Sequence, residues 1–389
     1  MSISRRNFLL ASAASAATIP SLTSARHQAT PTTATPVADA ADREARVLAA
    51  MEQHGIPGAI VLYESPEIGT WSSAFGVANL ETGDPMTVDM HMRIASITKT
   101  FTSTMILQLV DQGALAFDDT LATLLPSQAG LPNADTITLR HLLTMQSGLP
   151  DYVTPETVFG GDPDATITDE EIVGMIDGMD ANFAPGQRSE YSNTNYILLG
   201  MIANEVAGTP WPELIQTSVL DEVGLAHTSI PTSPDLPDPS PRGYVYEAAF
   251  LQSGTPSATP DVDAVPTDMT RINPYFPGAA GNMISTVDDL ATWIRVLLDG
   301  SLLSPELQAD RLDFSDEGII GDAESGMAYG LGLTKVQDAI GHDGGITGFR
   351  SSMLAVPETG EILITLANVI PTRDGGDPAA VLMNALLGE

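Results

Sequence analysis

The chain has 389 residues, of which 50 are acidic and 16 basic, so its formal net charge is −34. Such a charge repels phosphate backbones and anionic lipid, which argues against a nucleic-acid partner. The absence of cysteine excludes disulfides, thiolate metal sites and a cysteine nucleophile. No apolar run reaches the ~18 residues that a membrane span needs, and the length allows more than one domain.

The first 25 residues have the pattern of an export signal. Arg5 and Arg6 precede a short, weakly apolar stretch rich in Ala and Ser, and Thr23-Ser24-Ala25 offers small residues for cleavage after Ala25. The pattern predicts a twin-arginine-type signal peptide over residues 1–25, and thus export to the periplasm, the cell envelope or the medium. A frayed N-terminal helix is the alternative. Residues 26–41, rich in Thr, Ala and Pro, predict a disordered linker.

Strand patterns lie towards both ends of the remaining chain. A helix is expected from Asp42, ended by Gly55. Alternation and turn residues then predict strands over 58–64, 69–80, 342–356 and 362–369. A final helix is expected to begin at Asp377-Pro378 and to run through Leu387.

Between these ends the pattern is mostly helical. Helices are expected over 96–112, 195–207 and 286–299, and Thr168 with Glu171 matches a capping box. A segment rich in Pro, Asp and Ser, 232–267, predicts a loop excursion. The fold class is therefore α/β (α+β), with one antiparallel sheet flanked by helices. Residues 42–95 and 278–389 would form the sheet domain, and 96–277 an inserted, mostly helical domain.

The chain has only two lysines, and one of them, Lys99, follows Ser96 by three residues. Residues three apart share a helix face, so the hydroxyl and the amine are expected side by side. A serine at a helix start offers its own N–H to an oxyanion, and a buried lysine can stay neutral and act as a base. A helix cap beside a solvated charge explains this motif equally well.

A second segment, Pro185–Tyr196, holds Tyr191 and Asn193 just before an expected helix. A lysine ammonium nearby would stabilise the phenolate of Tyr191, which could then take the Ser96 proton. Asn193 could offer its amide to a substrate carbonyl or to Lys99. An asparagine-rich helix cap beside an interfacial tyrosine is the commoner origin of such a pattern.

The third segment contains His342, Asp343, Gly344 and Gly345 at the start of an expected strand. Glycines weaken a strand unless a ligand backbone must approach closely, so the Gly345 N–H is a candidate oxyanion donor. The alternative is a glycine-rich hairpin with His342 on the surface. Other catalytic patterns are missing from the sequence: a Gly-x-Ser-x-Gly elbow, a zinc motif, a phosphate loop and a dinucleotide fingerprint. No metal or cofactor is therefore expected.

Taken together and in this order, the three segments resemble the serine β-lactamase-like hydrolases. The branch they look most like holds class C β-lactamases, a serine D-Ala-D-Ala carboxypeptidase, D-aminopeptidases and related esterases. The similarity runs from about residue 43 to 388 and includes framing segments at His141–Thr144, Ser147–Pro150, Leu199-Gly200, Ser285-Thr286 and Asp289-Leu290. The resemblance implies the β-lactamase/transpeptidase-like fold, which matches the layout above, with the site between the sheet and the helical domain.

The resemblance also implies roles for the candidate residues. Ser96 would form an acyl-enzyme, with Lys99 as the adjacent amine and Tyr191 as the general base. The substrate would be bound by Asn193, His342, Asp343 and Gly344, and the oxyanion by the backbone N–H groups of Ser96 and Gly345.

One departure bears on the substrate. Many β-lactamases have Lys-Thr-Gly where this chain has His342-Asp343-Gly344. A carboxylate facing the cleft would repel an anionic substrate terminus. We therefore expect an exported hydrolase of a small ester or of a D-amino-acid amide or peptide, such as a peptidoglycan stem peptide. The alternatives are a class C-like β-lactamase and a penicillin-binding or envelope sensor protein that does not turn over.

Overall fold

The structure, a computed structural model, describes residues 36–154, 157, 161–252, 264–314, 319–320 and 327–388. The expected signal peptide and the first part of the expected linker lie outside these residues. Helix α1 (Pro36–His54) shows that the prediction of a disordered linker is wrong from residue 36 onwards. Good helix formers follow Pro36, and proline is well suited to the first turn of a helix. Gly55, with φ of +69°, ends the helix as predicted.

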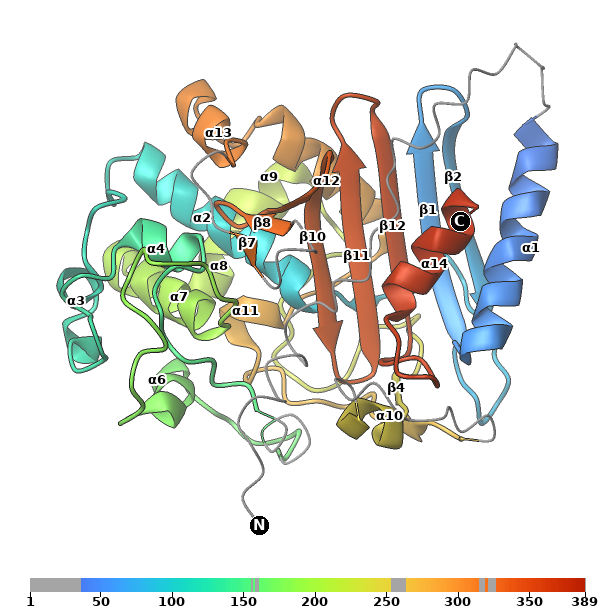
Figure 1. The fold of residues 1–389 in the computed structure, drawn as a ribbon, viewed down its shortest axis with the longest axis horizontal. Coiled ribbons are helices and arrows are strands. Elements are labelled where there is room, and N and C mark those ends of the chain that lie inside the picture. Colours follow the sequence, from blue (N-terminus) through green and yellow to red (C-terminus); the bar gives the residue numbers. More distant parts are fainter. Residues whose placement is uncertain are drawn as a thin grey trace.

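One eight-stranded sheet, in the order β2-β1-β12-β11-β10-β9-β8-β7, connects the two ends of the chain (Figure 1). Because β1 lies between β2 and β12, the prediction of an antiparallel sheet built from both ends is confirmed. The five long strands are β1 (Gly58–Ser65), β2 (Gly69–Gly76), β10 (Ala339–Ile346), β11 (Phe349–Val356) and β12 (Glu361–Ala367). Three short ones, β7 (Ile319–Ile320), β8 (Met327–Tyr329) and β9 (Thr334–Val336), extend the sheet beyond β10.

Two expected strands have different bounds in the structure. The single strand predicted over 342–356 is the hairpin of β10 and β11, which turns at Gly348 with φ of +86°. The second predicted strand ends at Gly76 instead of Leu80. Gly76 has φ of +72°, and a Cβ there would lie 2.1 Å from the Pro57 carbonyl oxygen. In both places a glycine in the left-handed region turns the chain out of the extended conformation.

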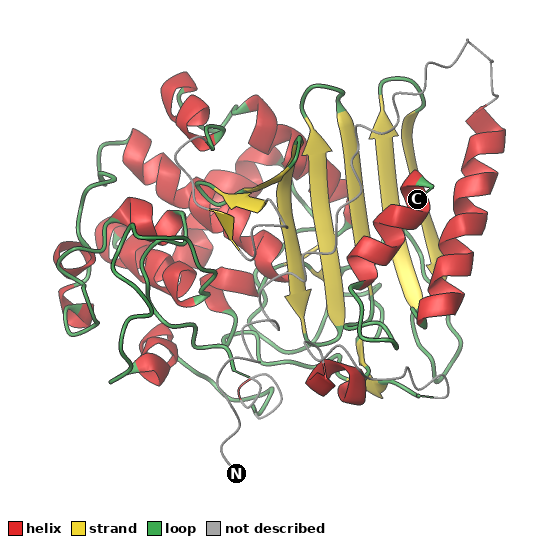
Figure 2. Ribbon diagram, viewed as in Figure 1, coloured by secondary structure: helices red, strands yellow, loops and turns green. Residues whose placement is uncertain are grey.

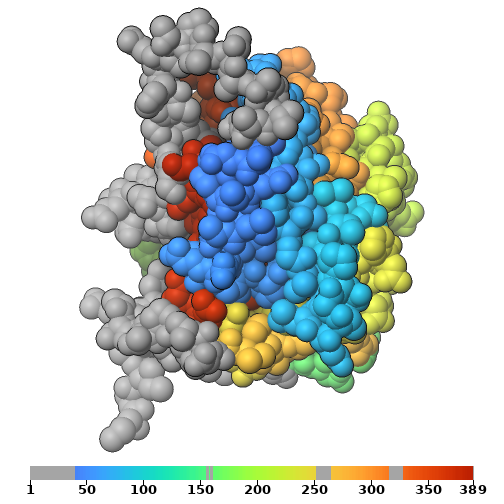
Figure 3. All heavy atoms as spheres, turned by 90° about the vertical axis from the view of Figure 1, so that its right-hand side faces the viewer, coloured from blue at the N-terminus to red at the C-terminus, as the bar shows by residue number. Residues whose placement is uncertain are grey.

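Helices cover both faces of the sheet (Figure 2). Side chains of β1 alternate: Ala59 and Val61 pack with Val47 of α1, and Ile60 and Leu62 belong to the core that contains Trp293. Helix α14 (Pro378–Leu387), capped by Asp377 as predicted, lies on the α1 side, and α12 (Val287–Asp299) lies on the other. Figure 3 shows α1 with residues from the C-terminal end of the chain beside it.

Most of the remaining helices lie on the side of the sheet beyond β10, on the left of Figure 1, whereas α10 (Glu247–Gln252) lies below the sheet in that view. The capping box at Thr168, the end of α7 at Gly208 and the end of α12 at Gly300 are confirmed. These remaining helices are η3 (Ala95–Ile97), α2 (Thr98–Asp111), α3 (Leu121–Leu124), η4 (Pro126–Gln128), α4 (Leu139–Leu143), α6 (Asp169–Val173), η5 (Gly174–Ile176), α7 (Thr194–Ala207), α8 (Trp211–Ile215), η6 (Gln216–Leu220), α9 (Asp221–Val223), α10 (Glu247–Gln252), α11 (Gly278–Gly281) and α13 (Pro305–Arg311). Two short strand pairs form sheets of their own: β3 (Met92–Arg93) with β6 (Ile284–Ser285), and β4 (Tyr244–Val245) with β5 (Thr267–Asp268).

The expected loop excursion at 232–267 is only partly loop, since it contains β4 and α10 and reaches β5. Its residues 253–263 lie outside the described part of the chain. Of the helices that the structure describes, none has the length and apolar character to cross a membrane. The division into a sheet domain and an inserted helical domain stays a prediction.

Candidate active site

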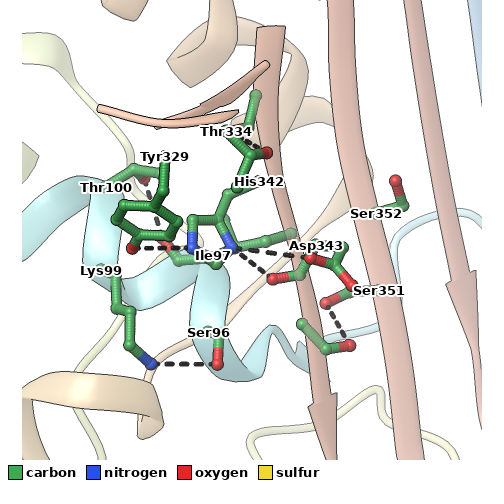
Figure 4. A network of polar contacts seen from close by, with 12 residues as sticks. Ser96, Ile97, Lys99, Thr100, Tyr329, Thr334, His342, Asp343, Ser351 and Ser352 are labelled. Carbon is green, nitrogen blue, oxygen red and sulfur yellow. Dashed lines mark hydrogen bonds and ion pairs between the residues drawn. The ribbon is translucent and has the colours of Figure 1, made fainter. Parts of the chain in front are cut away.

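Ser96 lies in η3, directly before the buried helix α2 and against strand β10 (Figure 4). The residue before it, Ala95, has φ of +48°, a left-handed conformation that costs a non-glycine residue about 1 kcal/mol or more. Its neighbour Ile94 is held on both sides: its N–H donates to Met283 O at 3.0 Å, and its carbonyl accepts from Ser351 Oγ at 2.9 Å. The surroundings therefore impose the strained turn that presents Ser96.

The Lys99 ammonium group is fully buried and has three acceptors. Its Nζ lies 3.1 Å from Ser96 Oγ, 2.7 Å from Asn193 Oδ1 and 2.7 Å from the Ala280 carbonyl. Burial lowers the pKa of Lys99 to about 7, although Asp151 and Asp343 oppose the shift. The interpretation of Lys99 as a solvated charge is excluded, and at neutral pH the amine and ammonium forms coexist beside the Ser96 hydroxyl.

Tyr191 completes the group that the sequence placed together. Its ring centroid lies 4.9 Å from Lys99 Nζ, and its side chain hydrogen-bonds that of Ser96. The structure therefore brings the hydroxyl, the amine and the phenol together. Burial raises the pKa of Tyr191 well above its usual value, so Tyr191 is a phenol and not a phenolate at neutral pH.

Asn193 uses both ends of its side-chain amide within the protein. Its Oδ1 accepts from Lys99, and its Nδ2 donates to Asp151 Oδ2 at 2.9 Å. Of the two partners expected for this amide, the structure shows Lys99. One of the two N–H bonds of the amide is directed to Asp151.

His342 is a buried, neutral residue, which excludes its interpretation as a surface histidine. Its Nε2 lies 3.1 Å from Tyr329 Oη and its Nδ1 lies 2.5 Å from the Asp343 carbonyl oxygen (Figure 4). Burial lowers the pKa of His342 to about 4. Its neighbour Tyr329 also meets the Tyr191 ring edge to face, with 6.0 Å between centroids. His342 therefore supports the ring that packs against Tyr191.

Asp343 carries a charge that the protein partly compensates. Arg350, which lies opposite Gly345 in the β10–β11 hairpin, pairs with Asp343 and also with Asp377, whose two oxygens lie 2.8 and 2.6 Å from Nε and Nη2. Burial opposes ionisation of Asp343, but Arg350 and His342 hold its pKa below the usual range. With Asp343 and Asp377 ionised, the three side chains carry one net negative charge beside the site.

Gly344 allows β10 to lie directly against the nucleophile. A Cβ at this position would lie 2.2 Å from Ile94 O, 2.6 Å from Ser351 Oγ and 3.0 Å from Ser96 N. Only glycine fits, so the absence of a side chain is what brings the strand next to the Ser96 amide. The backbone N–H groups of Ser96 and of the following strand residue, Gly345, remain the predicted oxyanion donors.

Sequence reasoning missed four residues that shape the site: Asp151, Tyr329, Arg350 and Asp377. Asp151 directly follows the framing segment Ser147–Pro150, which was the only available signal. The other three act through strand register and contacts across the fold, which sequence spacing does not reveal. Within the described residues, no group of three or more His, Asp or Glu side chains is placed to hold a metal ion.

Comparison with known proteins agrees with this geometry. The chain is 26% identical to penicillin-binding protein 4* of Bacillus subtilis over 332 residues, 82% of this chain and 69% of that protein. It is 28% identical to the D-aminopeptidase of Gluconobacter oxydans over 311 residues, 78% of this chain and 54% of that protein. Its fold matches a D-stereospecific amidohydrolase from Streptomyces with a TM-score of 0.74 and 28% identity, covering 89% of this chain and 99% of the other. The β-lactamase family model matches residues 43–386, and the chain therefore belongs to the β-lactamase family and is a serine hydrolase.

Proposed function

We propose that the protein is an exported hydrolase that forms an acyl-enzyme at Ser96 with esters or with amides and peptides of D-amino acids. The observation that carries this proposal is the contact of Ser96 Oγ with a buried lysine whose pKa is about 7. A serine hydroxyl becomes a good nucleophile only when a base close to neutrality takes its proton.

In the first step, the neutral amine of Lys99 accepts the Ser96 hydroxyl proton as Oγ attacks the substrate carbonyl carbon. The C=O π electrons move to oxygen, and the N–H groups of Ser96 and Gly345 receive the resulting oxyanion. Lys99 suits the role of base better than Tyr191 does, because burial favours the neutral form of both side chains. Neutral lysine is a base, whereas neutral tyrosine is an acid.

In the second step, the tetrahedral intermediate expels its amine or alkoxide. Tyr191 lies beside both Ser96 and Lys99, so its phenol can protonate the leaving group and recover a proton from the Lys99 ammonium. Water then attacks the acyl-ester with the same groups in reverse order, and Ser96 regains its proton.

The charge beside the site supports a substrate without an anionic terminus. Asp343, Arg350 and Asp377 together carry one negative charge, which disfavours the carboxylate of a β-lactam or of a D-Ala-D-Ala peptide. The charge favours a neutral ester or an amide with a free ammonium group. D-aminopeptidase and D-stereospecific amidohydrolase, the names of two relatives, are consistent with this choice. Export rests on the twin-arginine pattern at Arg5 and Arg6.

The test compares substrates in parallel on the purified full-length chain. We expect hydrolysis of p-nitrophenyl butyrate and D-phenylalanine p-nitroanilide, with slower turnover of the L-anilide, a D-Ala-D-Ala peptide and a chromogenic cephalosporin. Ser96→Ala should lower the rates by at least ~10³-fold, while Ser301→Ala, at an exposed turn, should keep them. Unchanged turnover by S96A would refute the proposal. Stable labelling by a fluorescent penicillin without turnover of any substrate would favour the non-catalytic receptor.

A further inference from the structure

We propose that Asp151 is a positioning residue of this site: it fixes the orientation of the Asn193 amide and thereby directs the amine of Lys99 at Ser96. The inference rests on the proposed acyl-enzyme chemistry at Ser96. It assigns a role to a carboxylate that lies behind the amide and not beside the nucleophile.

Asp151 is tied to Asn193 by both of its oxygens. Its Oδ1 accepts from the backbone N–H of Asn193 at 3.2 Å and from that of Val153 at 3.1 Å, and its Oδ2 accepts from Asn193 Nδ2 at 2.9 Å. The two segments are also joined beside it, since Thr194 Oγ1 donates to Pro150 O at 2.7 Å. The carboxylate therefore cannot turn away from Asn193 without breaking several hydrogen bonds.

A carboxylate only accepts hydrogen bonds, so the Asn193 group that faces it has to be the NH₂. This choice leaves the amide oxygen pointing the other way, towards Lys99 Nζ at 2.7 Å. The charge of Asp151 thus determines which end of the Asn193 amide meets the lysine. A neutral residue of the same shape at position 151 would not determine it.

The orientation of Asn193 determines in turn where the Lys99 lone pair lies. A neutral amine has two N–H groups and one lone pair, and Lys99 has two carbonyl acceptors, on Asn193 and Ala280. Once both N–H groups are directed at these carbonyls, the remaining direction is that of Ser96 Oγ, 3.1 Å away. The lone pair is therefore directed at the proton that the reaction must remove.

Other ionisable groups around Asp151 do not replace it. Lys99 faces it with opposite charge, whereas Tyr152 and Tyr191 are phenols whose pKa values burial holds well above 10. Desolvation raises the pKa of Asp151 to about 6, against the hydrogen bonds from Val153 and Asn193 and the charge of Lys99. At pH 7 and above the carboxylate is ionised, the form that holds the Asn193 NH₂.

Asp151→Asn tests the inference with almost no change of volume. The new amide keeps its oxygen on the two backbone N–H groups, so its NH₂ meets the NH₂ of Asn193. Asn193 must then rotate by 180° and present its NH₂ to Lys99, which draws the lone pair away from Ser96. We expect kcat/KM for p-nitrophenyl butyrate to fall ~10²-fold, the scale on which general-base catalysis acts. The acid limb of the remaining activity should move to lower pH, because a carboxylate near Lys99 is lost.

The reciprocal exchange, D151N with N193D, restores the pairing. The amide at position 151 now donates to a carboxylate at 193, whose other oxygen accepts from Lys99. We expect the double variant to be at least tenfold more active than D151N or N193D alone. Its acid limb should lie at higher pH than that of the wild type, since the carboxylate now touches the lysine.

Asp289→Asn is the matched control, because Asp289 is a buried carboxylate outside the catalytic cluster that accepts from a backbone N–H, His227 N at 2.9 Å, and from Thr228 Oγ1 at 2.8 Å. It should lower the melting temperature without moving the pH profile. The inference is overturned if folded D151N keeps wild-type kcat/KM and pH profile, or if the exchange gives no gain over the single variants. If D151N does not fold, the double variant decides: activity with the raised acid limb supports the inference, and a folded, inactive protein refutes it. Wild type without any Ser96-dependent turnover would instead contradict the proposed function.

Discussion

The pKa of Lys99 leads to a quantitative prediction for the pH dependence of hydrolysis. With a pKa of about 7, roughly 1% of the lysine is neutral at pH 5 and half of it at pH 7. The neutral amine is the base, so the titration of Lys99 alone should raise kcat/KM about 50-fold between these pH values, with a plateau above pH 8. The sign follows from the direction of the shift: deprotonation creates the active form, and activity is lost as pH falls.

The groups around Ser96 make this profile interpretable. His342, with a pKa of about 4, stays neutral across the range, and Tyr191 and Tyr329 stay protonated. Asp151, with a pKa of about 6, titrates in the same window as Lys99, and the two groups share their macroscopic pKa values. Protonating Asp151 disfavours the ammonium form of Lys99, but it also removes the carboxylate that orients Asn193, so below pH 6 activity should fall further than the neutral fraction of Lys99 alone gives.

The pKa of Lys99 can be measured directly, because the chain has only two lysines. Protein labelled with ε-¹³C lysine gives two side-chain signals, and Lys335→Arg identifies the one from Lys335, which lies over the Phe314 ring. The Lys99 signal should titrate near pH 7 and coincide with the acid limb of ester hydrolysis. A Lys99 midpoint above pH 9, or a flat rate from pH 5 to 8, would refute the assignment of Lys99 as the base. Melting curves at each pH confirm that the protein is folded.

Three further outcomes follow from the structure. Gly344→Ala places a Cβ 2.2 Å from Ile94 O and should lower kcat at least ~10²-fold. The control is Gly174→Ala, whose Cβ would lie 3.8 Å from its nearest neighbour, and equal rates for the two variants would disprove the close approach of β10. Arg350→Met leaves Asp343 and Asp377 without their cation and should lower the unfolding free energy in urea by roughly 3 kcal/mol at pH 7, so a loss below about 0.5 kcal/mol would contradict the ion pair. Arg5→Lys with Arg6→Lys should retain the protein in the cytoplasmic fraction, and undiminished export would rule out the twin-arginine signal.

The fold was predictable where local chemistry decides it. Ser96 and Lys99 share a face because three residues make nearly one helical turn. Thr168 caps a helix because the Glu171 side chain accepts a hydrogen bond from its backbone N–H in return. The two errors in the strand bounds fell where an extended pattern hid a turn. The hairpin at Gly348 looked like one continuous strand, since only the left-handed φ of that glycine separates β10 from β11.

The electrostatics of the site could not be predicted in the same way. The sequence showed the carboxylate of Asp343, but it did not show which cation forms an ion pair with it. Gly345 lies opposite Arg350 in the hairpin, and this register brings the guanidinium to Asp343. Asp377, which holds Arg350 from the start of α14, is brought there only by the complete fold. Such partners depend on long-range packing, which a pattern of neighbouring residues does not encode.

The position of β12 has a consequence for biosynthesis. This strand lies between β1 and β11, yet it leaves the ribosome long after β1 and β2. Until it emerges, the hairpin of β1 and β2 has an open apolar edge, and such an edge invites pairing with other chains. A nascent chain that stops before Glu361 is therefore expected to be protease-sensitive and to require a chaperone, however much of its helical part has already formed.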